Sequence, residues 1–228
     1  MEKERCISIK KSLIEYIETN FPEFTYEGGT SSFYAFVRKS ENGIHDYILI
    51  EREFYNGEIH LIISEVASCY NTSWKCIPNT TVGFGTSLGA LITGKNYYQA
   101  GTGSHVCDNN YDDLQNAFCG IRSDIERYVL KYFDKCHRDI NNDKQLSTVY
   151  SYMQTQLKLL TNEDVQSIVN HRKQSEKDRQ SSGNVFHPIE EKWISEIQQE
   201  LGYTSVADKL RNQIARMVII LFREKYII

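Results

Sequence analysis

The sequence predicts an α+β fold: a three-stranded, or slightly larger, antiparallel meander packed on helices, followed by an all-α C-terminal region. Three β-rich runs, at 31–39, 45–55 and 59–68, follow one another and are separated by the pairs Asn42-Gly43 and Asn56-Gly57. Asn-Gly is the preferred pair for two-residue hairpin loops, because both loop positions need positive φ. Beyond residue 110, apolar residues recur every three or four positions, which is the period of amphipathic helices.

The first element expected is a helix over residues 6–19, where apolar residues form one stripe beside lysines and glutamates. Phe21-Pro22 ends it, because the residue before a proline is disfavoured in the α region. The stretch 26–30 contains two glycines and is expected to be a loop that leads into the sheet.

Two-residue loops also predict the register of the meander. Ala35 then lies opposite Ile50, Ile50 lies opposite Ile63, and Glu53 lies opposite His60. One face is expected to form the core, with Ala35, Val37, Ile48, Ile50, Phe54, Ile59, Leu61 and Ile63. The other face carries aromatic, charged and aliphatic groups, namely Tyr34, Phe36, Arg38, Tyr47, Leu49, Glu51, Glu53, His60, Ile62 and Ser64.

Residues 69–109 contain many glycines, which indicates tight turns rather than long elements. A short helical turn is expected at 87–92 and a short strand at 97–99. Five helical segments are expected after that: 111–133, 146–160, a segment from 161 to about 180, 188–201 and 205–226. Thr161 with Asp164 and Ser205 with Asp208 have the spacing of N-terminal caps, and a polar break is expected at 139–144. The predicted domains are an α+β domain at 1–138 and a helical region of four helices at 139–228.

Composition and charge exclude several classes of protein. No window approaches the ~18 uninterrupted apolar residues that a membrane span needs. Residues 1–138 hold 14 Lys and Arg against 18 Asp and Glu, and residues 139–228 hold 12 of each. Because neither half is a basic arm, nucleic acid is not expected as a partner. Lys209, Arg216 and Arg223 line one edge of the last predicted helix, and such residues are more often the solvated flank of a packed helix.

The N-terminus has charged residues where a secretory signal would have an apolar block, so a cytoplasmic protein is expected. Six cysteines are scattered through a chain that is large enough to fold without disulfides, and reduced thiols are therefore expected. The cysteines and histidines lack the paired spacings of structural zinc sites, so no metal and no cofactor are predicted.

The candidate binding residues are Tyr34, Arg38, Glu51, Glu53, His60, Trp74, Tyr97 and Tyr98. The first five share the polar sheet face under the predicted register, where an acid, a base and a cation would line one surface. The alternative is an ordinary solvated face on which Glu53 and His60 form a cross-strand pair. The apolar residues on that face indicate partial coverage by later helices or by a partner.

No catalytic residue is predicted. His105 and Cys107 are two positions apart, but nothing in the sequence holds the two side chains together. A serine nucleophile is not predicted, because the pattern G-x-S-x-G is absent. The glycines at 83, 85 and 89 follow no parallel strand, so they are expected to serve turns rather than a phosphate-binding loop.

The segments FYAFV, YILIERE, IHLIISEVA, TSLGALI and IERYVLKYFDK occur in an order that resembles a bacterial domain family of unknown function. The resemblance covers about residues 6–138. It implies an α+β fold and brings no catalytic residues with it. We expect a non-enzymatic protein-binding module, similar to an immunity, antitoxin or adaptor protein, because aromatic anchors dominate protein interfaces. Its contact surface would be the aromatic and acidic sheet face or the Tyr-rich glycine loop. The alternative is a small hydrolase or transferase that uses Glu51, Glu53 and His60 as acid and base groups.

Overall fold

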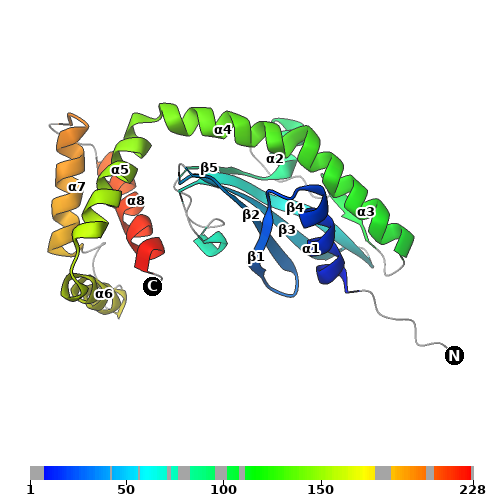
Figure 1. Cartoon of the computed structure of the whole chain (residues 1–228), viewed down its shortest axis with the longest axis horizontal. Coiled ribbons are helices and arrows are strands. Elements are labelled where there is room, and N and C mark those ends of the chain that lie inside the picture. The colour runs from blue at the N-terminus through cyan, green and yellow to red at the C-terminus, as the bar shows by residue number, and fades with distance from the viewer. Residues whose placement is uncertain are drawn as a thin grey trace. The chain divides into compact units, whose positions relative to one another are not determined.

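The computed structural model describes residues 8–41, 43–55, 57–70, 73–76, 83–95, 102–107, 111–177, 186–203 and 208–226. The chain divides into two compact units, Met1–Ile140 and Asn141–Ile228. In the described residues, the first unit combines an antiparallel sheet with helices, and the second contains helices and no strand (Figure 1). The predicted α+β class with a helical C-terminal region is confirmed.

The sheet of the first unit is larger than the predicted three strands. Its strands are β1 (Thr25–Gly29), β2 (Phe33–Lys39), β3 (His45–Tyr55), β4 (Glu58–Cys69), β5 (Gly83–Thr86) and β6 (Ser104–Val106). The order is β1-β2-β3-β4-β5, with β6 also paired to β4, and all these pairs are antiparallel. The segment 97–99, which we expected to form a strand, lies outside the described residues.

The loop predicted at 26–30 is wrong, because most of this stretch forms β1. Tyr26 pairs with Phe36, and the register of β1 shifts between Tyr26 and Gly28. A Cβ atom on Gly28 would lie 2.7 Å from Nε1 of Trp74, so the absence of a side chain lets the Trp74 ring approach the strand. The glycines therefore allow close approaches within a strand, rather than a loop, and the extra residue at the register shift is Glu27.

The second hairpin follows the sequence prediction. Tyr55 pairs with Glu58 across a two-residue turn in which Gly57 has φ of 86°. Glu53 lies opposite His60, and Ile50 lies opposite Ile63, as predicted. Further along, β4 gains one extra residue at Ser64, and this bulge turns Val66 toward the helices.

The first hairpin differs from the prediction by one residue. Tyr34, not Ala35, lies opposite Ile50. The N–H of Ser40 donates to the carbonyl of Ile44 (3.2 Å), and Gly43 has φ of 82°. These features belong to a three-residue loop with glycine in the left-handed position, a common alternative to the two-residue turn.

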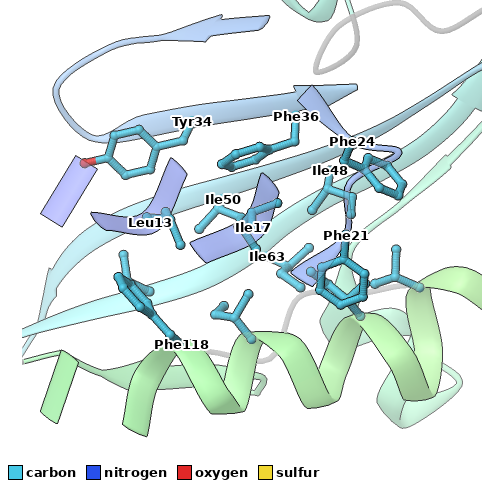
Figure 2. Packing of buried hydrophobic residues seen from close by; sticks show 14 of the residues in the cluster. Leu13, Ile17, Phe21, Phe24, Tyr34, Phe36, Ile48, Ile50, Ile63 and Phe118 are labelled. Atoms are coloured by element: carbon cyan, nitrogen blue, oxygen red, sulfur yellow. The ribbon is translucent and has the colours of Figure 1, made fainter. Parts of the chain in front are cut away.

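This shift moves every side chain of β2 to the other face of the sheet. Tyr34 and Phe36 lie in the core beside Ile48 and Ile50 (Figure 2), whereas Ala35 and Val37 belong to a smaller cluster on the opposite face. The predicted core is therefore correct for Ile48, Ile50, Ile59, Leu61 and Ile63, and wrong for Ala35, Val37 and Phe54. Phe54 is 76% exposed.

Helices cover the core face of the sheet. α1 (Ile9–Asn20) begins after Ser8, whose Oγ accepts the N–H of Lys11, and it buries Leu13 and Ile17 against the strands (Figure 2). α3 (Tyr111–Asp124), one π-helical turn η2 (Ile125–Val129) and α4 (Leu130–Asn142) form one continuous helix. The short helices η1 (Trp74–Cys76) and α2 (Leu88–Thr93) lie between the strands in sequence, and α2 confirms the turn expected at 87–92.

The polar break predicted at 139–144 is wrong in extent. The helix continues to Asn142, and Asp143 caps the next helix by accepting the N–H of Leu146 (2.9 Å). Asp143 is therefore the single residue between the two helices, and it begins the second one because Asp is a favoured N-cap residue.

The second unit contains α5 (Lys144–Leu159), α6 (Asn162–Lys177), α7 (Pro188–Glu200) and α8 (Asp208–Tyr226). The predicted cap of α6 is confirmed: Oγ1 of Thr161 accepts the N–H of Asp164 (3.1 Å), and Asp164 accepts the N–H of Thr161 (3.0 Å). The predicted cap at Ser205 lies outside the described residues. Within the described helices, none is long and apolar enough to cross a membrane.

Candidate functional site

Three of the predicted site residues share the sheet face opposite the helices. Glu51 and Glu53 occupy alternate positions of β3, and His60 of β4 lies directly opposite Glu53. Burial and the neighbouring Glu53 raise the pKa of Glu51, and burial raises the pKa of Glu65 on the same face. Within the described part of the chain, no ion pair engages Glu51, Glu53 or Glu65, so this face is acidic.

Two apolar side chains are exposed in this part of the sheet, Val106 on the carboxylate face and Phe54 on the opposite face. Phe54 is 76% exposed near the β3–β4 turn, and Val106 of β6, opposite His60, is 41% exposed. Because neighbouring residues of a strand alternate between faces, Phe54 projects from one side of the hairpin and Glu53 from the other. We call residues 51–60 together with Val106 the hairpin tip.

His60 has a partner that the sequence did not predict. Its Nδ1 lies 2.6 Å from Oγ of Ser104 in β6, within hydrogen-bond distance. Its Nε2 lies 3.7 Å from a carboxylate oxygen of Glu58, and the His60 side chain is only 13% exposed. Ser104 was missed because it is 44 residues from His60 and no local motif marks it.

Tyr34 and Arg38 do not join the carboxylates, which corrects the predicted convergence of five residues. The shifted register of β2 places both on the helix-covered face. Tyr34 is 1% exposed, and its hydroxyl donates to the carbonyl of Ser31 (3.1 Å). Tyr34 is therefore a core residue.

Trp74 lies on the face opposite the helices, but near β1 and β2. Its ring packs 5.5 Å from the ring of Phe33, and the backbone N–H of Trp74 donates to Oε2 of Glu27 (3.3 Å). It covers the smaller apolar cluster that includes Tyr47 and Leu49. Tyr97 and Tyr98, the other predicted aromatic contacts, lie outside the described residues.

Arg38 belongs to a second polar cluster, centred on Asp46. Asp46 is fully buried, and its carboxylate accepts from Nε of Arg38 (2.9 Å), from Nε2 of His137 in α4 (2.9 Å) and from the hydroxyl of Ser68. The guanidinium of Arg38 also lies 5.2 Å from the ring centre of Phe24. These partners offset the free-energy cost of removing the Asp46 carboxylate from water.

His105 and Cys107 point toward the helices and have separate environments. Nε2 of His105 lies 2.7 Å from Oδ2 of Asp124 in α3, whereas Cys107 is fully buried in the core. The cysteines with described side chains form no disulfide; they are Cys69, Cys107, Cys119 and Cys136. In the described part of the chain, no group of three or more His, Cys, Asp or Glu residues is placed to hold a metal ion.

The second unit contains a polar cluster at the start of α7. Nδ1 of His187 accepts the N–H of Ile189 (3.3 Å), and Glu190 accepts the N–H of His187 (3.0 Å). Buried Glu190 also pairs with Arg172 of α6. Burial, and then the neighbouring His171, lower the pKa of His187. On α8, Arg216 is exposed and Arg223 is half-buried, whereas the side chain of Lys209 lies outside the described residues.

Comparisons with protein-family models, with curated proteins and with solved structures found no match for this chain.

Proposed function

We propose that this protein is a non-enzymatic protein-binding module, similar to an immunity, antitoxin or adaptor protein, and that it binds its partner through the hairpin tip. The observation that carries the proposal is the exposure of Phe54, at 76%, on the same hairpin as Glu51 and Glu53, two carboxylates that form no ion pair with a described residue. Aromatic side chains are the commonest anchors of protein interfaces, and they gain most when a partner removes them from water.

The chemistry of the tip selects a cationic partner. Glu51 and Glu53 of β3 and Glu58 of β4 share the sheet face that carries His60 and Val106, and burial raises the pKa of Glu51. A Lys- or Arg-rich segment with interspersed apolar residues would neutralise these carboxylates and cover the apolar side chains. Such complementarity increases both the specificity and the rate of association.

A fluorescent peptide of alternating lysine and leucine tests the proposal by anisotropy. Phe54→Ser and Glu53→Gln should each weaken binding by about fivefold or more, the usual threshold for an interface anchor. Leu159→Ser is the matched control, because Leu159 lies in α5 of the other unit and is 70% exposed. Equal losses in the Phe54 and Leu159 variants would mean nonspecific apolar binding and would contradict the proposal.

We also propose a cytoplasmic location, which the four described cysteines support by forming no disulfide, because thiols persist in reducing compartments. The resemblance of residues 6–138 to a bacterial domain family of unknown function is compatible with this proposal and adds no site residue.

The second candidate function is a small hydrolase or transferase that uses His60 as the base, with Glu51 and Glu53 as acidic groups. The observation that favours it is the 2.6 Å distance between Nδ1 of His60 and the hydroxyl of Ser104. A histidine at this distance from a hydroxyl can remove its proton during nucleophilic attack.

A further inference from the structure

We propose that Ser104 is a nucleophile activated by His60 and that this pair hydrolyses small apolar acyl esters. The inference rests on the second candidate function, which is the alternative to the non-enzymatic module, and it names the nucleophile and the substrate class. Oγ of Ser104 lies 2.6 Å from Nδ1 of His60, the separation of a serine nucleophile from its general base. Ser104 therefore supplies the nucleophile that the acid and base groups of the sheet face lack.

The strand pairing orients a backbone donor toward the substrate. The N–H of Cys107 donates to the carbonyl of Ile59 (2.6 Å), so Ile59 and Cys107 form a hydrogen-bonded pair of the β4–β6 ladder. Hydrogen-bonded and non-hydrogen-bonded pairs alternate in antiparallel sheets. The pair of Ile62 with Ser104 is thus non-hydrogen-bonded, and the N–H of Ser104 points away from β4, where it can donate to an oxyanion.

The surroundings define the third group and the substrate. Oε2 of Glu58 lies 3.7 Å from Nε2 of His60, which makes Glu58 a positioning residue that can stabilise the protonated imidazole. Val106, two residues from Ser104 on the same strand and face, is 41% exposed and gives an apolar acyl chain a surface to contact. A short, uncharged acyl group suits this acidic surface better than an anionic one.

The reaction balances with the ester and water alone. Oγ of Ser104 attacks the ester carbonyl carbon while its proton moves to Nδ1 of His60, and His60 then protonates the departing alkoxide. Water next attacks the acyl-Ser104 ester and gives a proton to His60. The carboxylic acid leaves as His60 returns this proton to Oγ of Ser104.

The experiment uses the full chain with two probes, a fluorophosphonate and p-nitrophenyl acetate. The fluorophosphonate should label Ser104, as located by mass spectrometry of the wild-type protein, which needs no variant. Ser104→Ala and His60→Gln should each lower ester hydrolysis by about 100-fold or more, the usual contribution of a general base. Glu58→Gln should lower kcat and leave KM unchanged. Ser64→Ala is the control, because the Ser64 hydroxyl only donates to the carbonyl of Leu49 (3.3 Å).

The outcomes distinguish the role of Ser104 as the nucleophile from the hydrolase function as a whole. Hydrolysis that persists in Ser104→Ala, or a label on another residue, would overturn the role of Ser104 and leave the hydrolase function standing. Absence of both labelling and hydrolysis in the wild type would overturn the hydrolase function together with it. Labelling of Ser104 that is lost in His60→Gln and kept in Ser64→Ala would support both.

Discussion

Nε2 of His137 lies 2.9 Å from Oδ1 of Asp46, so a partly exposed imidazole on α4 is joined to a fully buried carboxylate on β3. The two residues are 91 positions apart in the sequence. The contact joins α4 to the sheet at the end of the core where Arg38 lies, and it belongs to a cluster in which Arg38, Ser68 and His137 all contact Asp46.

Asp46→Asn should destabilise the first unit by about 3 kcal/mol. Removing one partner of a buried charge pair costs about 3–5 kcal/mol, and the lower end applies because Arg38 and His137 can still reach water. Urea unfolding followed by circular dichroism measures the change. Asp134→Asn, an exposed position on α4, should change the free energy of unfolding by less than about 0.5 kcal/mol. Equal effects at the two positions would show that Asp46 contributes no more than a surface carboxylate.

Glu51→Gln should stabilise the protein slightly at neutral pH. Burial and Glu53 raise the pKa of Glu51, so the folded state holds the proton more tightly than the unfolded state. The stability that Glu51 contributes is present below its ordinary pKa and is lost as pH rises through the raised value. The gain in the urea midpoint of the variant over wild type should therefore be larger at about pH 7 than at about pH 4. A gain that grows toward acid pH would contradict this assignment.

The second unit should lose stability as the solution becomes mildly acidic. Burial and the nearby His171 lower the pKa of His187, with Arg172 acting in the same direction and Glu190 and Asp164 opposing it. Because the pKa is lower in the folded state, His187 contributes fully to the free energy of unfolding at pH values above its unfolded-state pKa of about 6.5. This contribution is lost as pH falls through the folded-state pKa. Protonation of Nδ1 also removes the acceptor for the N–H of Ile189.

Fluorescence of Trp193, which is buried in the second unit, can report this loss in a Trp74→Phe background. Trp74 and Trp193 are the two tryptophans of the chain, so the signal is then specific to the second unit. His187→Ser keeps an N-cap acceptor that does not titrate, and its urea midpoint should vary less with pH between about 7.5 and 5. An unchanged pH dependence in that variant would assign the effect to another group.

The sequence predicts a turn or a helix start correctly where neighbouring residues alone determine it. Asn56-Gly57 predicts the second hairpin and its register, and Thr161 with Asp164 predicts the start of α6. The equivalent pair at 42–43 predicts the first hairpin but not its register, because Ser40 and Ile44 close a longer loop around Gly43. One residue of difference moves Tyr34 and Arg38 to the other face and separates them from the rest of the predicted site.

Contacts between residues that are far apart in the sequence cannot be predicted from local sequence motifs. Asp46 is a carboxylate in an otherwise apolar strand, and a buried carboxylate needs hydrogen-bond or ionic partners. No local sequence motif indicates that His137 and Ser68 are those partners. Ser104 likewise becomes a candidate only when β6 pairs with β4 and brings it to His60. Glu51, Glu53 and His60 share a face as predicted, because the hairpin that holds them is fixed by its own turn.

The hairpin tip as the contact surface is tested most directly by an NMR titration of the ¹⁵N-labelled protein with the lysine–leucine peptide. We predict that the largest amide shifts fall on residues 51–60 and 104–106, and that they diminish as salt screens the carboxylates. Largest shifts on α8, where Arg216 is exposed, or on residues of the second unit in general, would contradict the assignment of the contact surface to the sheet.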